Sequence, residues 1–81
     1  MDITIVYCRT CNYMPMAAAL AREIKETLGL AVKYEAGRSG IFDVTADGEM
    51  VFSKRAEGDR FPKKGEVVAL LKSRMEKGKG Q

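Results

Sequence analysis

The spacing of apolar residues divides the first half of the chain into three segments. Residues 3–7 form an apolar and β-branched run in which Ile3, Ile5 and Tyr7 alternate with Thr4 and Val6. Such a run is typical of a buried strand, and we expect both faces of this strand to be covered. Over residues 13–28 apolar side chains recur every three or four positions, predicting an amphipathic helix that ends at Gly29. Alternation returns over residues 30–35, so the order predicts a parallel, right-handed βαβ unit. The helical positions expected to face the core are Met14, Ala17, Ala21, Ile24 and Leu28.

The second half predicts a β-hairpin and a final helix. Residues 41–46 and 50–54 flank Asp47-Gly48, a dipeptide that favours the two-residue type I′ turn. After a polar stretch, a helical pattern begins near Pro62, where proline is tolerated. Its apolar face is expected to contain Val67, Val68, Leu70, Leu71 and Met75.

These elements predict a single domain of the α/β (α+β) class. Its expected order is βαβββα, with a mixed four-stranded sheet and two helices packed on one sheet face. A chain of 81 residues cannot bury a second core. We expect the domain to span residues 1–76, and residues 77–81 to form a flexible tail because they contain no apolar side chain.

Composition and charge narrow the function classes. Hydrophobic residues make up 46% of the chain and charged residues 31%, values typical of a folded globular protein. The formal net charge of +3 is modest and dispersed, so nucleic-acid or membrane binding is not expected. The N-terminus lacks a basic segment followed by a long apolar run, and we therefore expect a cytoplasmic location.

The chemistry is expected at the only two cysteines, which form the motif Cys8-Arg9-Thr10-Cys11. This motif falls between a strand and a helix, the setting typical of thioredoxin-like redox sites. The positive end of a helix would stabilise a thiolate there. Two intervening residues also let the second thiol resolve a mixed disulfide formed on the first. Cys8 and Cys11 are therefore the candidate catalytic residues.

Two other roles for the cysteines are less favoured. A structural disulfide across about four residues would restrict the unfolded chain by only roughly 2 kcal/mol. A zinc site usually needs four cysteine or histidine ligands, and the chain has no histidine, so only a site shared between two chains could form.

Two further segments leave a structural and a functional interpretation open. Gly37 and Gly40 enclose Arg38-Ser39, which more often forms a simple turn than an anion-binding one. Phe61 follows a polar loop, where it could contact a partner or fix the last helix to the sheet. Tyr7 and Tyr13 beside the motif are expected to pack rather than to bind a partner.

Several short motifs, in one order along the chain, resemble the selenoprotein W family, also called Rdx. The resemblance extends over roughly residues 3–71, which is more specific than the cysteine motif alone. It rests on Val6-Tyr7-Cys8-x-x-Cys11-x-Tyr13, Gly40-Ile41-Phe42-Asp43-Val44, Asp47-Gly48, Val51-Phe52-Ser53-Lys54 and Arg60-Phe61-Pro62.

The resemblance implies a thioredoxin-like fold and redox activity on thiols. Animal members carry selenocysteine at the position of Cys11, which implies that Cys11 attacks, whereas the general thioredoxin pattern favours Cys8. We place Cys8 slightly ahead, with Cys11 resolving. Neither Pro15 nor Pro62 precedes a strand as the active-site cis-proline of many thioredoxins does, so substrate recognition is expected to differ from that of thioredoxin.

The leading hypothesis is an oxidoreductase that cycles between the dithiol and disulfide forms of Cys8 and Cys11. Its expected partners are protein thiols or disulfides and glutathione. Glutathione is a candidate co-substrate and electron donor, and a thioredoxin system is the other candidate donor. No built-in metal or organic cofactor is expected. The alternative is a binding module whose affinity for a protein partner depends on the redox state of the cysteines.

Overall fold

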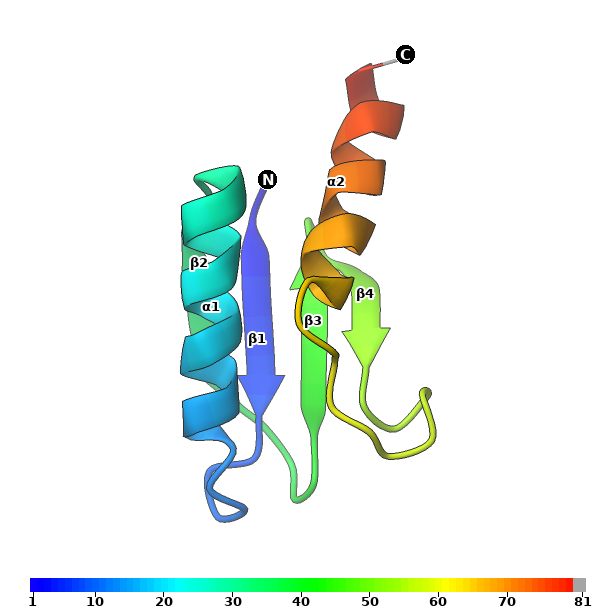
Figure 1. Ribbon diagram of the computed structural model, residues 1–81. Helices are drawn as coiled ribbons and strands as arrows, with labels where there is room; N and C mark the ends of the chain where they lie inside the picture. Colours follow the sequence, from blue (N-terminus) through cyan, green and yellow to red (C-terminus); the bar gives the residue numbers. More distant parts are fainter. Residues whose placement is uncertain (80–81) are drawn as a thin grey trace.

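The computed structural model describes the backbone of residues 1–79 and the side chains of residues 1–76. The observed order of elements is the predicted βαβββα (Figure 1). The elements are β1 (Ile3–Tyr7), α1 (Met14–Leu28), β2 (Val32–Ala36), β3 (Phe42–Ala46), β4 (Glu49–Ser53) and α2 (Glu66–Lys79).

The strands form one mixed sheet in the order β2-β1-β3-β4. β1 pairs in parallel with β2 and antiparallel with β3, so Ile5 lies between Tyr34 and Val44. β3 and β4 form the predicted hairpin. Asp47 and Gly48 have φ values of 52° and 83°, and two positive φ angles are what a type I′ turn requires.

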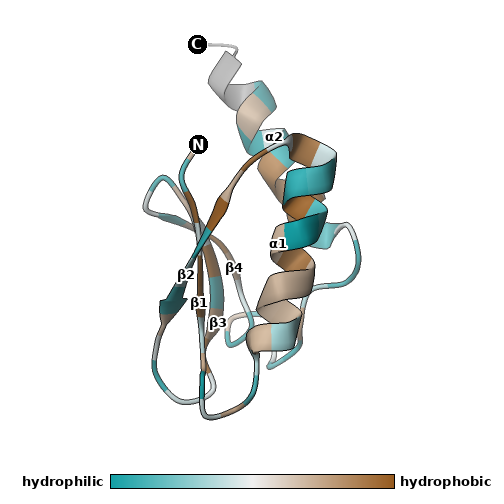
Figure 2. Cartoon of the chain, turned by 90° about the vertical axis from the view of Figure 1, so that its left-hand side faces the viewer, coloured by the Kyte–Doolittle hydropathy of each residue, from teal (hydrophilic) through white to brown (hydrophobic). Residues whose placement is uncertain are grey.

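Both helices pack on the same face of the sheet, which leaves the opposite face uncovered (Figures 1 and 2). On β1, Ile3 and Ile5 are buried beneath the helices, whereas Thr4 and Val6 on the outer face are partly exposed. The prediction that both faces of this strand are covered was therefore wrong. Two helices form only one layer, and they cover only one side of a four-stranded sheet.

α1 forms where the apolar spacing predicts it. Gly29 ends the helix with a φ of 71°, and its amide donates to the carbonyl oxygen of Lys25 at 2.9 Å. The buried face is rotated slightly from the predicted one, because Leu20 is buried while Met14 at the first turn remains 40% exposed. The buried residues of α1 are Ala17, Leu20, Ala21 and Ile24.

α2 begins at Glu66, four positions later than expected from Pro62. Gly65 has a φ of 82°, a conformation that interrupts a helix, and its amide donates to both carboxylate oxygens of Glu23 on α1. Val67, Val68 and Leu71 are buried as predicted, but Leu70 is 40% exposed. The helical face toward the core is thus narrower than the run of apolar residues suggests.

The predicted tail at residues 77–81 is only partly described. The backbone of α2 continues as a helix to Lys79, three residues past the predicted end of the domain. Gly80 and Gln81 lie outside the described residues, so the division at residue 76 stays a prediction.

The core lies between the helices and the inner face of the sheet. Phe42 is its largest fully buried side chain, at 1% exposure. It lies at the start of β3 and packs edge-to-face against Tyr13 and Phe61. Three segments therefore meet at one end of the core: the residue just before α1, the start of β3 and the segment before α2.

A network centred on Arg60 holds the segment before α2. Its guanidinium donates to both carboxylate oxygens of Glu66, at 2.8 and 2.7 Å, and to Glu57 at 3.0 Å. The amide of Lys63 also donates to Glu66, at 2.9 Å. The hydrogen bonds from Arg60 and then from the Lys63 amide lower the pKa of Glu66 from 4.5 to about 2.

This network predicts a pH-dependent effect of Glu66→Gln on stability. Because the folded-state pKa of Glu66 is lowered, its contribution is fully present above pH 4.5 and is lost as the pH falls toward about 2. We expect the substitution to lower the free energy of unfolding at pH 7, with the difference from wild type shrinking across that acid range. Urea titrations at several pH values measure this. Glu57→Gln, which removes a single contact to Arg60, is the control and should have a smaller effect.

Candidate functional site

The two cysteines lie in the connection between β1 and α1. Cys8 directly follows β1, and a tight turn closed by the Asn12 amide on the Arg9 carbonyl oxygen, at 3.1 Å, brings Cys11 back toward it. Asn12 adopts a φ of 59°, which asparagine tolerates better than most residues. The two Sγ atoms lie at disulfide-bonding distance, with the Cα atoms 5.3 Å apart.

Cys8 is held from several sides. Its amide donates to the carbonyl oxygen of Ile41 at 2.9 Å, which fixes the backbone just beyond β1. Its Sγ accepts a hydrogen bond from the Cys11 amide at 3.1 Å and lies 3.4 Å from the Thr10 hydroxyl oxygen. The residue is 1% exposed. Cys8 is therefore a positioned and nearly inaccessible sulfur.

Cys11 is partly exposed and is held by one contact from a distant segment. Its Sγ accepts a hydrogen bond from the Gly40 amide at 3.3 Å. Gly40 belongs to the connection between β2 and β3, which Figure 1 shows at the same end of the sheet as the cysteine loop. Cys11 is thus the more exposed cysteine of the pair.

The connection between β2 and β3 forms the turn that the sequence predicts. The Ile41 amide donates to the Arg38 carbonyl oxygen at 3.2 Å, and the Gly37 amide donates to the Tyr7 carbonyl oxygen at 2.9 Å. A Cβ atom on Gly37 would lie 2.5 Å from Cγ1 of Val6, so only glycine fits here without a shift. This close approach brings Gly40 and Ile41 to the cysteine pair.

The expected stabilisation of the sulfurs by helix amides is not what the structure shows. Within residues 1–79, the amides that donate to the two sulfurs belong to Cys11 and Gly40, both in loops. α1 begins at Met14, three residues beyond Cys11, and Pro15 in its first turn has no N–H. The electrostatic consequence is similar, because an amide hydrogen directed at sulfur stabilises a thiolate.

An aromatic cluster supports the loop from the core side. Tyr13 and Phe61 pack edge-to-face with ring centroids 4.9 Å apart, and both contact Phe42. Nζ of Lys54 lies 5.7 Å from the Tyr13 ring and 5.5 Å from the Phe61 ring. This packing favours the structural interpretation of Phe61, which fixes the segment before α2 to the core.

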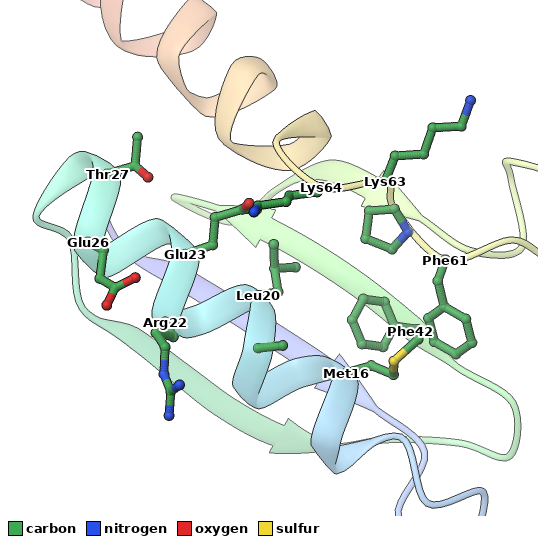
Figure 3. Close-up of a pocket in the computed structure, with 12 residues that line it drawn as sticks. Met16, Leu20, Arg22, Glu23, Glu26, Thr27, Phe42, Phe61, Lys63 and Lys64 are labelled. Atoms are coloured by element: carbon green, nitrogen blue, oxygen red, sulfur yellow. The ribbon is translucent and has the colours of Figure 1, made fainter.

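An apolar groove beside the helices does not include the cysteine motif. It has a volume of about 450 Å³ and lies between α1 and the segment before α2, with Met16, Leu20, Phe42 and Phe61 among its lining residues (Figure 3). None of residues 8–11 lines it. The groove meets the site only through the aromatic cluster described above.

Neither a metal-binding cluster nor a membrane-spanning helix is found in the described part of the chain. No three His, Cys, Asp or Glu side chains among these residues come together in a way that could hold a metal ion. Of the two helices seen there, neither is long and apolar enough to span a membrane.

Solved structures share this architecture. A selenoprotein W-related protein from Vibrio cholerae aligns with a TM-score of 0.76 and 28% identity, covering 89% of this chain and 92% of that one. A protein from Bordetella parapertussis aligns with a TM-score of 0.84 and 24% identity, covering 90% and 95% of the two chains. The second likeness concerns the fold alone. The predicted thioredoxin-like α+β fold is confirmed.

Sequence relatives and a family model agree with the structural likeness. Migration and invasion enhancer 1 of Mus musculus is 28% identical over 73 residues, which are 89% of this chain and 63% of the relative. The Bos taurus protein of the same name is 28% identical over 71 residues, or 86% and 61%. The chain therefore spans about six tenths of the length of these relatives. The Rdx family model matches residues 2–73, and the chain belongs to the Rdx family.

Proposed function

We propose that this protein is a thiol–disulfide redox protein whose Cys8 and Cys11 cycle between the dithiol and the disulfide. The observation that carries the proposal is the asymmetry of the pair. The two sulfurs are at bonding distance, yet Cys8 is 1% exposed while Cys11 is partly exposed. Such a pair has one sulfur accessible to a partner and a second one placed to resolve the mixed disulfide.

The exposure of the two cysteines supports the opposite order of attack to the one that we favoured from the thioredoxin pattern. In the proposed reductive half-cycle, the Cys11 thiolate attacks a partner disulfide, forming a mixed disulfide and releasing one partner thiolate. The Cys8 thiolate then attacks Cys11 Sγ, which forms the Cys8–Cys11 disulfide and releases the second partner thiolate. Two electrons pass from the protein to the partner, and each released thiolate takes up a proton.

The contacts of Cys8 support its resolving role. When the Cys8–Cys11 bond is broken at Cys11, the negative charge resides on Cys8 Sγ. That atom receives the Cys11 amide hydrogen bond at 3.1 Å and lies 3.4 Å from the Thr10 hydroxyl oxygen. Both donors are suited to stabilise a thiolate, which makes Cys8 a good leaving group in one direction and a ready attacking group in the other.

The proposed cycle needs a partner thiol or disulfide but no bound metal or organic cofactor. Glutathione and thioredoxin-type proteins are the proposed electron donors, and protein disulfides are the proposed acceptors. We place the cycle in the cytoplasm, where the reducing environment returns the pair to the dithiol.

A redox titration tests the proposal directly. The protein is equilibrated in glutathione buffers between about −300 and −150 mV, alkylated and weighed by mass spectrometry. We expect reversible interconversion of a form with two alkylated thiols and a form with none. Two thiols that stay reduced in every buffer would contradict the proposal.

A second experiment distinguishes a redox enzyme that turns over from a redox-sensitive binding module. The reduced protein is mixed with an oxidised protein disulfide, and the free thiols of both are counted over time. We expect the disulfide to be reduced as Cys8 and Cys11 become oxidised. A pair that titrates with glutathione but transfers no electrons to any disulfide tested would leave the binding module as the function.

A further inference from the structure

A small polar cavity lies on the side of the sheet away from the helices and includes residues of the connection between β2 and β3. It has a volume of about 170 Å³. Asp43 lies in its wall and is paired in register with Val6 and with Ser53, which places these positions on the uncovered face of the sheet. The side chains and backbone that line it include Arg38, Ser39, Gly40, Asp43, Ser53 and Arg55.

Gly40 connects this cavity to the disulfide. Its backbone forms part of the cavity wall, and its amide donates to Cys11 Sγ at 3.3 Å. Cys11 is the accessible sulfur of the pair. Gly40 therefore belongs both to the cavity wall and to the contact with the sulfur that undergoes exchange.

The cavity carries two cationic groups on a wall that can also donate hydrogen bonds. Arg38 and Arg55 are both exposed, and among the side chains of residues 1–76 neither forms an ion pair with a carboxylate. Ser53 Oγ accepts from the Ala56 amide at 3.4 Å, which leaves its hydroxyl hydrogen to donate. Guanidinium groups beside hydroxyl donors are well suited to a carboxylate.

Asp43 restricts which anions the cavity accepts. Asp43 lines the same cavity as the two arginines, so a second negative charge is repelled there and an ammonium group is attracted. The volume is below the range of about 300–1,000 Å³ typical of drug-sized ligands. A group of a few atoms that carries one carboxylate and one ammonium, such as the end of an amino acid, matches both properties.

We propose that this cavity binds the amino-acid end of a low-molecular-weight thiol, with Arg38 and Arg55 on its carboxylate and Asp43 on its ammonium group. This proposal rests on the proposed thiol–disulfide function and names the class of co-substrate for it. Cysteine and glutathione share the required chemistry. A molecule held there has its thiol at the end of the sheet that also carries Cys11.

The reaction served by this site is reduction of the protein disulfide. A first thiolate attacks Cys11 Sγ, forming a mixed disulfide while the bond to Cys8 breaks and the Cys8 thiolate takes up a proton. A second thiolate attacks the small-molecule sulfur of the mixed disulfide and releases the Cys11 thiolate, which takes up the second proton. Two small thiols are oxidised to one disulfide, and the protein gains two electrons and two protons.

The test compares rate constants for reduction of the wild-type disulfide by four thiols. Mercaptoethanol carries neither charged group, 3-mercaptopropionate carries only a carboxylate, and cysteine and glutathione carry both. Each rate is measured again for Arg38→Ala, Arg55→Ala and the double variant. Arg22→Ala removes the same charge from an exposed site on α1 outside this cavity and is the matched control. Dividing each variant rate by the wild-type rate cancels the intrinsic reactivity of each thiol.

We expect each single variant to slow the carboxylate-bearing thiols about threefold and the double variant about tenfold, with mercaptoethanol changed less than twofold. Asp43→Asn should slow cysteine and glutathione relative to 3-mercaptopropionate. Equal losses for all four thiols, or an equal effect of Arg22→Ala, would overturn the proposed subsite. Lack of reduction by any thiol, mercaptoethanol included, would instead overturn the redox function on which it rests.

Discussion

Cys8→Ser is expected to accumulate a stable mixed disulfide with oxidised glutathione, whereas Cys11→Ser is expected to form it at least about tenfold more slowly. The reason is access, since Cys11 is partly exposed while Cys8 is 1% exposed and enclosed by its own loop. Without Cys8, nothing resolves the adduct on Cys11. Intact-protein mass spectrometry over a time course measures both rates.

The opposite ranking of the two serine variants would contradict the assignment. If Cys11→Ser forms the adduct faster, then Cys8 is the attacking sulfur, as in the general thioredoxin pattern, and the loop must open before reaction. A variant with both cysteines replaced is the control and should form no adduct. Circular dichroism of all three variants checks that the fold is retained.

Phe42→Ala is expected to destabilise the folded protein by about 3–5 kcal/mol. Phe42 is 1% exposed and packs against Tyr13 and Phe61, so its removal leaves a cavity that two other elements line. A loss of that size is a large part of the total stability of a small domain, about 5–15 kcal/mol. Urea unfolding, followed by circular dichroism on the oxidised protein, measures the change.

Two further variants make the Phe42 prediction specific. Phe42→Leu keeps most of the volume and is expected to cost about 1.5 kcal/mol or less. Tyr34→Ala removes an aromatic ring that is 44% exposed at the edge strand and should cost less than about 1 kcal/mol. Equal destabilisation by Phe42→Ala and Tyr34→Ala would show that Phe42 does not occupy the centre of the core.

The sequence predicts the fold well because each element carries a local signal. The alternation over residues 3–7 and the helical spacing before Gly29 depend on neighbouring residues alone, and both elements form where expected. Errors arise where the outcome depends on the rest of the molecule. Whether the outer face of β1 is covered depends on how many helices are available, and the delayed start of α2 depends on contacts of Gly65 and Glu66.

The site is predictable only in part for the same reason. Cys8 and Cys11 are identified by spacing and by their place between a strand and a helix. Gly40 and Ile41 escape such reasoning, because Gly40 contacts a sulfur 29 positions away in the sequence, through pairing of β1 with β3. The glycines at 37 and 40 were the available signal, since a turn with two glycines permits a close backbone approach.

The antiparallel pairing of β1 with β3 also makes the chemistry of the cysteines dependent on the completion of folding. During synthesis, a chain that has emerged as far as Ala36 contains both cysteines and the whole βαβ unit. It still lacks the Ile41 carbonyl that holds the Cys8 amide and the Gly40 amide that contacts Cys11. The contacts that Gly40 and Ile41 make with the two cysteines therefore form only once β3 has docked against β1.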